Sequence, residues 1–186
     1  MNKMNKTCLL CWMVWLWGGT VVLGQNAESP LPDAVFVSDA QIRQAVQNPT
    51  GGVQDALLRV VPVKAGYNIG ISVVRRSLVK GKVVPDALQH HSISEVYHVT
   101  QGCGTLRTGG TLVGAKEMPA DNAAVLTLIG PTAQGAEIKG GSTRQVGPGD
   151  VVVIPPDTPH GFSDICPDGI TYVLVRVDSA HVLQPR

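Results

Sequence analysis

The sequence predicts an all-β domain, a sandwich or barrel of short strands, with one short helix in front of it. Turn-forming residues are frequent, with 21 glycines and 13 prolines in 186 residues. Between them lie short β-branched segments that have the period of strands, at the spacing typical of sandwiches and barrels. The predicted strands are 57–63, 68–78, 95–100, 104–108, 124–129, 137–138, 145–146, 151–154 and 171–177.

One helix is expected, over residues 37–46. Ser38 or Asp39 can cap its N-terminus, and Ile42 and Val46 recur at helical spacing. A proline and two glycines follow this segment and end it.

The first 24 residues are typical of an export signal. Lys3 and Lys6 stand before an apolar run over 8–23, and small or apolar groups precede Gln25, where a signal peptidase would cut. Two glycines interrupt the run, which favours a cleaved signal over a permanent anchor. We therefore expect an exported protein, periplasmic or secreted, with no stable membrane span after processing.

The sequence divides into four parts, of which one is a folded domain. The mature chain of about 160 residues suits a single core. The parts are the signal peptide 1–24, an N-terminal extension with the short helix 25–56, the β-barrel 57–178 and a C-terminal tail 179–186.

The mature chain is close to neutral. Loss of Lys3 and Lys6 leaves 13 basic residues against 14 acids, and no block of basic residues is present. Nucleic acid and anionic membrane surfaces are therefore not expected as partners.

Two cysteines remain after processing, Cys103 and Cys166, because Cys8 and Cys11 leave with the signal. In an oxidising compartment they can form one disulfide. Two buried free thiols are an equally good interpretation, since the sequence does not give the distance between the two Cα atoms. Neither cysteine has a close-spaced partner, so they do not predict a metal site.

Four of the five histidines lie in or beside two short segments, 89–98 and 155–160. The first contains His90, His91 and Glu95, and the second ends at His160. Imidazole and carboxylate suit Fe, Mn, Ni, Zn or Cu. Ligands from two strand-and-turn units can form a facial triad, so the sequence predicts one divalent transition metal held by His90, His91 or both together with Glu95 and His160.

Strand alternation sorts the residues around Glu95. If Glu95 points into the barrel, Tyr97 and Val99 point the same way, and His98 faces outward. His90 and His91 precede a predicted turn, so either or both can face the side of Glu95. Phe162 shares the inward side with His160 and is expected to wall the cavity together with Tyr97.

At these residues the sequence resembles the cupin superfamily. The usual first motif places a glycine seven residues after its glutamate, as Gly102 follows Glu95 here. The second motif has a glycine, a proline, a turn glycine, a histidine and an asparagine at fixed spacing. The corresponding residues here are Gly149, Pro155, Asp157, His160 and Asp164.

The resemblance departs from the family pattern at the first histidine of the first motif. That position is Leu88 if His90 is the second histidine, or Gln89 if His91 is. Three arrangements follow: a three-ligand site, a site with both adjacent histidines, or one in which Gln89 supplies an oxygen. Asp157 replaces the turn glycine, which is tolerable because Asp adopts left-handed conformations more readily than most residues.

The resemblance implies a single cupin-type double-stranded β-helix, a jelly-roll barrel. The longer stretch between the motifs, 112–144, suggests an extra hairpin. This hairpin could be a lid or a dimer-forming strand, but decoration of a loop is the more economical interpretation. Cupins commonly pair through exposed strands, so a homodimer is expected.

The implied function is a metal-dependent enzyme, a dioxygenase, oxidase or decarboxylase acting on a small molecule. Tyr97 would orient the substrate or act as an acid, and Glu95 or His91, where it is not a ligand, would act as a base. A non-catalytic module that binds a small ligand or metal is the alternative, and a metal-free sugar isomerase or epimerase is a third interpretation.

Overall fold

The computed structural model describes residues 33–47, 52–63, 66–79 and 87–184. The predicted signal peptide 1–24 lies outside these residues. The structure divides the chain at Ala34, and the unit Val35–Arg186 contains every element described below. Within the described ranges, neither of the two helical segments has the length or hydropathy that a bilayer-spanning helix needs.

The predicted helix is present as α1 (Asp39–Ala45). Ser38 caps it, because its hydroxyl accepts a hydrogen bond from the backbone N–H of Gln41. The Gln41 side chain in turn accepts from the backbone N–H of Ser38, which completes a capping box. The side chain of Gln54 donates to the carbonyl of Ala45 and ties the end of α1 to the first strand.

Strands make up most of the remaining described chain. They are β1 (Val53–Val63), β2 (Tyr67–Arg76), β3 (Ala87–His90), β4 (Ile93–Thr108), β5 (Thr111–Val113), β6 (Lys116–Glu117), β7 (Thr132–Gly135), β8 (Glu137–Lys139), β9 (Ser142–Val146), β10 (Val151–Ile154) and β11 (His160–Asp178). The predicted strands 95–100 and 104–108 are therefore one continuous strand, β4.

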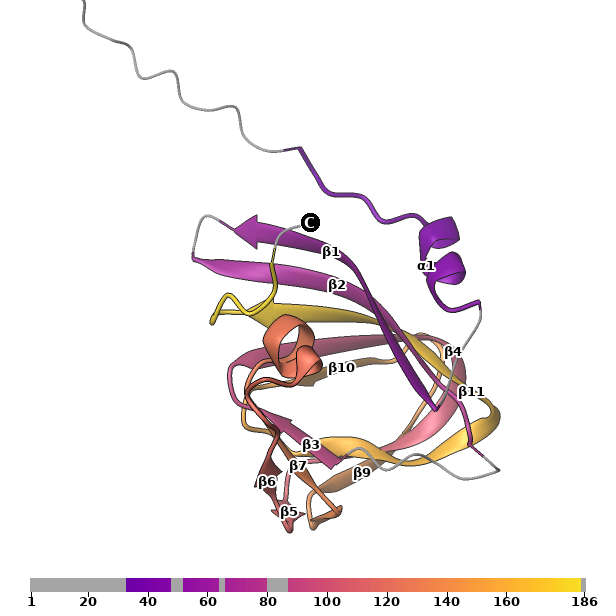
Figure 1. Cartoon of the computed structure of the whole chain (residues 1–186). Coiled ribbons are helices and arrows are strands. Elements are labelled where there is room, and N and C mark those ends of the chain that lie inside the picture. Colours follow the sequence, from indigo (N-terminus) through magenta and orange to yellow (C-terminus); the bar gives the residue numbers. More distant parts are fainter. Residues whose placement is uncertain (1–32, 48–51, 64–65, 80–86, 185–186) are drawn as a thin grey trace, which may run out of the picture. The chain divides into compact units, whose positions relative to one another are not determined.

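Nine of these strands form one antiparallel sheet that folds over on itself (Figure 1). The two longest strands, β4 and β11, pair with each other and take part in both halves. One half has the order β1-β2-β11-β4-β10, and the other has the order β6-β7-β3-β11-β4-β9. The predicted fold class, an all-β cupin-type double-stranded β-helix with a short N-terminal helix, is confirmed.

Gly102 lets β4 and β11 pass together from one half to the other. Its backbone has φ +69°, a left-handed conformation that favours glycine, and a Cβ atom there would overlap the backbone of Gly169. The register between the two strands shifts in this region, between Ile165 and Ile170. The glycine that matches the first cupin motif is thus required by a close approach of two backbones.

The core fills the space between the two halves. Tyr97 stacks on Tyr172 with ring centres 4.4 Å apart, and Phe162 stacks on the same ring at 6.0 Å. Tyr97 and Val99 are buried and His98 is exposed, as strand alternation predicted. The main cluster consists of Val74, Tyr97, Val99, Leu106, Val146, Ile154, Phe162, Ile165, Ile170, Tyr172 and Leu174.

The predicted strand 124–129 is wrong: this segment is helical, with π-helical geometry over η1 (Val125–Ile129). The Asn122 side chain accepts a hydrogen bond from the backbone N–H of Ala124, 2.9 Å away, and so starts a helical turn. Leu126 on this turn is 58% exposed, whereas an inward strand residue would be buried. A side-chain cap thus outweighed the β-propensity of the apolar run.

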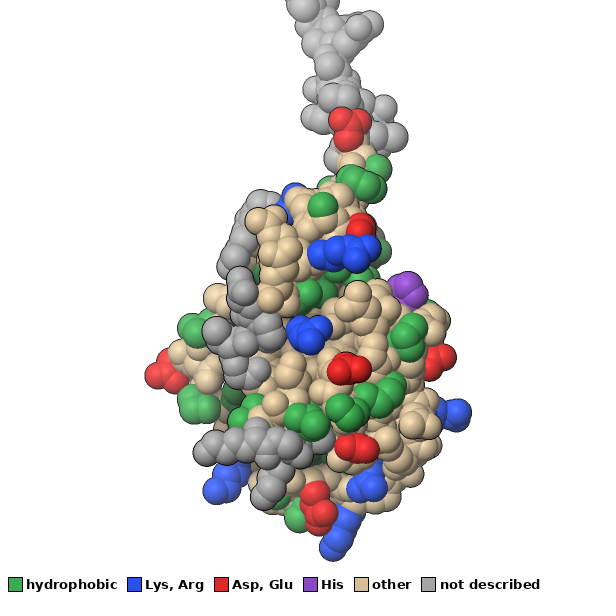
Figure 2. Space-filling model, turned by 90° about the vertical axis from the view of Figure 1, so that its right-hand side faces the viewer, with side chains coloured by type: hydrophobic (Ala, Val, Ile, Leu, Met, Phe, Trp, Pro, Cys, Tyr) green, Lys and Arg blue, Asp and Glu red, His purple; other side chains and the backbone are tan. Residues whose placement is uncertain are grey.

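The rest of the segment between the two motifs forms short strands. β5 pairs with β8 in a separate two-stranded sheet, and β6 adds to the edge of the main sheet beside β7. On the face of the molecule in Figure 2, acidic and basic side chains lie interspersed, with no block of one sign.

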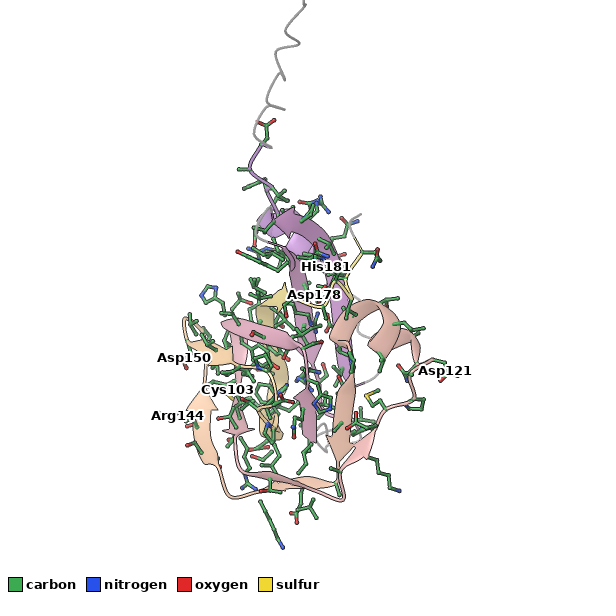
Figure 3. All side chains as sticks on the ribbon, turned by 90° about the vertical axis from the view of Figure 1, so that its left-hand side faces the viewer. Cys103, Asp121, Arg144, Asp150, Asp178 and His181 are labelled. Carbon is green, nitrogen blue, oxygen red and sulfur yellow. A yellow bond between two sulfur atoms is a disulfide. The ribbon has the colours of Figure 1, made fainter. Side chains whose placement is uncertain are left out.

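Cys103 and Cys166 are joined by a disulfide that links β4 to β11 beside the Gly102 crossing (Figure 3). Their Cα atoms lie 5.3 Å apart. Of the two interpretations that the sequence left open, the structure therefore has the bonded pair.

The Cys103→Ser/Cys166→Ser double variant should be less stable than the wild type by about 2 to 5 kcal/mol. The crosslink joins residues 63 positions apart, and its loss gives the unfolded chain more conformational freedom. Guanidinium denaturation measures the difference. A reducing agent should destabilise the wild type to the same extent and leave the double variant unchanged; an unchanged wild-type midpoint under reduction would contradict the prediction.

Candidate metal centre

His90, Glu95 and His160 come together inside the barrel. Each offers one ligand atom, and these atoms all lie within 4.8 Å of one another. All three side chains are at most 4% exposed. The three residues come from the end of β3, the start of β4 and the start of β11.

Local chain geometry brings the two motifs together. His90 ends β3, and after a short bend β4 turns Glu95 inward, where Glu95 is opposite Ile154 of β10. Asp157 then takes a left-handed conformation with φ 58°, as the substitution for the motif glycine predicted. Its backbone N–H donates to the carbonyl of His90 at 2.7 Å. This hydrogen bond fixes the turn before His160 against β3.

His160 is oriented by its own turn. Its Nδ1 lies 2.9 Å from the carbonyl oxygen of Thr158, and a carbonyl can only accept, so Nδ1 carries a proton. In the neutral ring, Nε2 then has a lone pair, and it lies 3.4 Å from Oε2 of Glu95.

His90 is held in the same way from the other side. Its Nδ1 lies 2.8 Å from the hydroxyl oxygen of Thr132, and that hydroxyl is 2.9 Å from the carbonyl of Gly130, to which it donates. The Thr132 oxygen therefore accepts from His90, and Nε2 of His90 presents its lone pair 3.6 Å from Oε1 of Glu95. Burial lowers the pKa of His90 to about 4, which keeps the ring neutral at neutral pH.

Glu95 is ionised although it is buried. Burial opposes its charge, but the surrounding groups, among them the positive charge of Arg176, outweigh burial and hold the pKa of Glu95 well below its usual range. The Tyr97 hydroxyl donates to Oε2 at 2.9 Å, and Nε of Arg176 donates to Oε1 at 3.2 Å.

The donor set fits a divalent transition metal. Two imidazole lone pairs face one carboxylate at close range, an electron-rich arrangement that is favourable only with a positive centre between the groups. In both rings Nδ1–H is already committed to a backbone or hydroxyl oxygen, as is usual for histidines that bind metal through Nε2.

Tyr97 contributes a neutral phenol to the site. Burial and the negative charge of Glu95 raise the pKa of Tyr97 well above its ordinary value. Its proton stays on the oxygen and lies in the hydrogen bond to Glu95.

A cavity of about 170 Å³ adjoins the three residues. Part of its wall is apolar, and part consists of the candidate ligands and two arginines. The lining residues are Val53, Asp55, Val74, Arg76, Leu88, His90, Glu95, Tyr97, Leu128, Ile129, His160, Tyr172, Leu174 and Arg176.

The structure does not bring His91 into this group. Its side chain is one-third exposed, with Nδ1 2.6 Å from Asp157 and Nε2 3.2 Å from Glu117. Gln89 is half-buried and does not line the cavity. Of the three arrangements considered from the sequence, the structure brings together the residues of the three-ligand site.

Sequence reasoning missed Arg176, Asp55 and Thr132, which hold the candidate ligands in place. A signal for Arg176 was available, because it continues the inward alternation of Tyr172 and Leu174 in an apolar strand. Asp55 and Thr132 gave no such signal, since polar residues at strand ends are common.

Phe162 was expected to line the cavity together with Tyr97. In the structure Phe162 packs on Tyr172 and is not among the residues that line the cavity.

No family model matches the sequence, and no curated protein matches it. Solved structures similar to the chain include KdgF from Halomonas sp., with 17% identity, a TM-score of 0.42, and coverage of 70% of this chain and 84% of that one. DMSP lyase DddQ from Ruegeria pomeroyi has 16% identity and a TM-score of 0.42, and the match covers 73% of this chain and 51% of that one. Oxalate decarboxylase from Bacillus subtilis has 15% identity and a TM-score of 0.40, and the match covers 69% of this chain and 26% of that one. The matched region thus spans about half of DddQ and a quarter of the oxalate decarboxylase.

Thr132→Val should lower the free energy of unfolding by about 1 to 3 kcal/mol, measured in metal-free buffer. The valine keeps the shape of threonine but leaves the buried Nδ1–H of His90 without its acceptor. Thr111→Val, at an exposed position on β5, is the matched control and should change stability by no more than about 0.5 kcal/mol. Equal unfolding curves for the two variants would contradict this role of Thr132.

Proposed function

We propose that this chain, a cupin by its fold and its two motifs, is a metal-dependent enzyme that acts on a small molecule. The observation that carries the proposal is the buried group of His90, Glu95 and His160, whose donor atoms converge beside a cavity. Nε2 of each histidine and the carboxylate of Glu95 would hold one divalent ion of Fe, Mn, Ni, Zn or Cu.

Three protein ligands leave coordination positions open for a substrate, and the bound ion would supply Lewis-acid or redox chemistry there. The reaction classes we propose are those of dioxygenases, oxidases and decarboxylases. Thr132 and Thr158 keep the two imidazoles in the tautomer that points Nε2 at the site.

The walls of the cavity restrict what can bind. About 170 Å³ corresponds to roughly six water molecules at about 30 Å³ each, so the ligand is small. Leu88, Leu128, Ile129 and Leu174 form apolar wall and limit the water beside the reacting groups. Tyr97 keeps its proton on the hydroxyl oxygen and can reorient it from Glu95 toward a substrate.

A non-catalytic binding module is the second candidate, and one observation favours it. Both oxygens of Glu95 already accept hydrogen bonds, from Tyr97 and from Arg176. With these two donors and the proposed metal on its carboxylate, Glu95 is a poor base, and the proposed enzyme must take its acid and base from the substrate or from Tyr97.

We also propose that the protein is exported and forms a homodimer. The basic and apolar segments of residues 1–24 support export, and a disulfide between Cys103 and Cys166 suits an oxidising compartment. Val151 and Val153 on β10 are 61% and 64% exposed, and pairing of two chains through this strand would cover them.

Untagged protein should contain about one transition metal ion per chain by elemental analysis, and His90→Ala, Glu95→Ala and His160→Ala should each abolish it. Each variant removes one of three donors, which lowers affinity by several orders of magnitude. His91→Ala and His98→Ala are the matched controls, because they remove an imidazole outside the converging group. Metal-free wild-type protein whose Tm is unchanged by added metal would refute the proposed site.

Oxygen uptake and CO₂ release distinguish the enzyme from the binding module. The metal-loaded protein should turn over at least one member of a panel of small phenolic and dicarboxylic acids, and Tyr97→Phe should lower kcat by about 10² or more. Tyr97→Phe keeps the stack on Tyr172, so a folded variant with normal metal content isolates the hydroxyl. Compounds that raise the Tm without being consumed would favour the binding module.

A further inference from the structure

Arg176 lies at the centre of a buried charge network beside the candidate metal ligands. Its side chain is 2% exposed and its guanidinium meets two carboxylates, those of Asp55 and Glu95. Nε donates to Glu95, and both terminal nitrogens lie against the carboxylate of Asp55. One terminal nitrogen also donates to the hydroxyl of Ser72 at 2.9 Å.

The two carboxylates do not share Arg176 equally. Asp55 faces two nitrogens of the guanidinium, whereas Glu95 accepts one hydrogen bond at 3.2 Å. Paired, two-pronged contacts between arginine and carboxylate are stronger than single ones. Asp55 is therefore the main partner of Arg176, and Glu95 remains incompletely neutralised.

The charge of this network determines how well a cation can bind. The guanidinium of Arg176 is positively charged, as arginine always is in proteins, and it meets the carboxylates of Asp55 and Glu95. Together the three groups carry one net negative charge. If Asp55 were neutral, the three groups would carry no net charge, and Arg176 would both bind Glu95 more strongly and repel a cation beside it.

We propose that Asp55 is a positioning residue for the metal centre: by engaging Arg176, it leaves Glu95 with the negative charge that a divalent cation needs. The inference rests on the proposed metal site. Asp55 acts through Arg176 and is not one of the three converging donor residues.

The position of Asp55 makes the proposal testable. It lies on β1 opposite Val74, and its side chain is 18% exposed, in contrast to the fully enclosed Arg176. Asparagine has the same shape as aspartate, so Asp55→Asn removes the charge with little change in packing. Ser72→Ala removes a hydrogen bond from the same guanidinium without changing any charge.

Isothermal titration of metal-free protein with Zn²⁺ tests the inference. Asp55→Asn should raise the Kd for Zn²⁺ by about 10- to 100-fold, the usual effect of losing a group that supports a metal ligand. Ser72→Ala should change the Kd only a few-fold. Glu137→Gln, which removes the same charge from an exposed position on β8, should leave it unchanged.

A double variant shows whether Asp55 acts through Arg176. Asp55→Asn/Arg176→Gln removes both charges, so its Kd should return toward the wild-type value from that of Asp55→Asn. Asp55→Glu keeps the charge and should bind Zn²⁺ within a few-fold of the wild type.

The inference is overturned if Asp55→Asn binds Zn²⁺ as the wild type does, if Ser72→Ala weakens binding equally, or if the double variant binds no more tightly than Asp55→Asn. If Asp55→Asn does not fold, the double variant is compared with the wild type. A 10-fold weaker affinity of the double variant for Zn²⁺ then overturns the proposal. A wild-type protein that binds no Zn²⁺ would instead refute the proposed metal site itself.

Discussion

The structure depends on one buried carboxylate. Glu95 lies between two imidazole rings, a phenol and a guanidinium, all of them enclosed by the barrel. A buried charge loses its hydration, and the desolvation penalty is large for every charged or polar group that is not paired. The buried carboxylate is therefore stable only when its partners are placed in the correct geometry. The fold therefore has to place side chains of three strands, β3, β4 and β11, around two oxygen atoms.

The two long strands meet this requirement. β4 contributes Glu95 and Tyr97 on its inward face, and β11 contributes His160 near its start and Arg176 near its end. Because β4 and β11 pair with each other through both halves of the barrel, the pairing of these two strands sets the positions of all four residues. Gly102 and the neighbouring disulfide hold the crossing where the register shifts. Stability of the barrel and geometry of the site are thus properties of the same strand pair.

The sequence predicted what depends on local pattern. Alternation along one strand placed Tyr97 inside and His98 outside, and the turn signal at Asp157 matched its left-handed backbone. The helical segment η1 was mistaken for a strand because the cap by Asn122 is a single side-chain contact that β-propensity does not include. Arg176 and Asp55 were missed because their pairing joins β1 to β11, residues 121 positions apart, and no pattern within either strand indicates the other.

Leu88 explains how the site tolerates the loss of a usual motif histidine. His90 is the second histidine of the motif if four residues precede Glu95, and the first then falls at Leu88, two residues earlier on β3. Both side chains line the cavity, as strand alternation requires, and Leu88 is opposite His160 across the pairing of β3 with β11. The substitution therefore replaces a donor by an apolar wall and leaves the other ligands where the fold puts them. At the position of that motif histidine the cavity wall is therefore apolar, and a small molecule in the cavity would contact hydrocarbon there rather than a third imidazole.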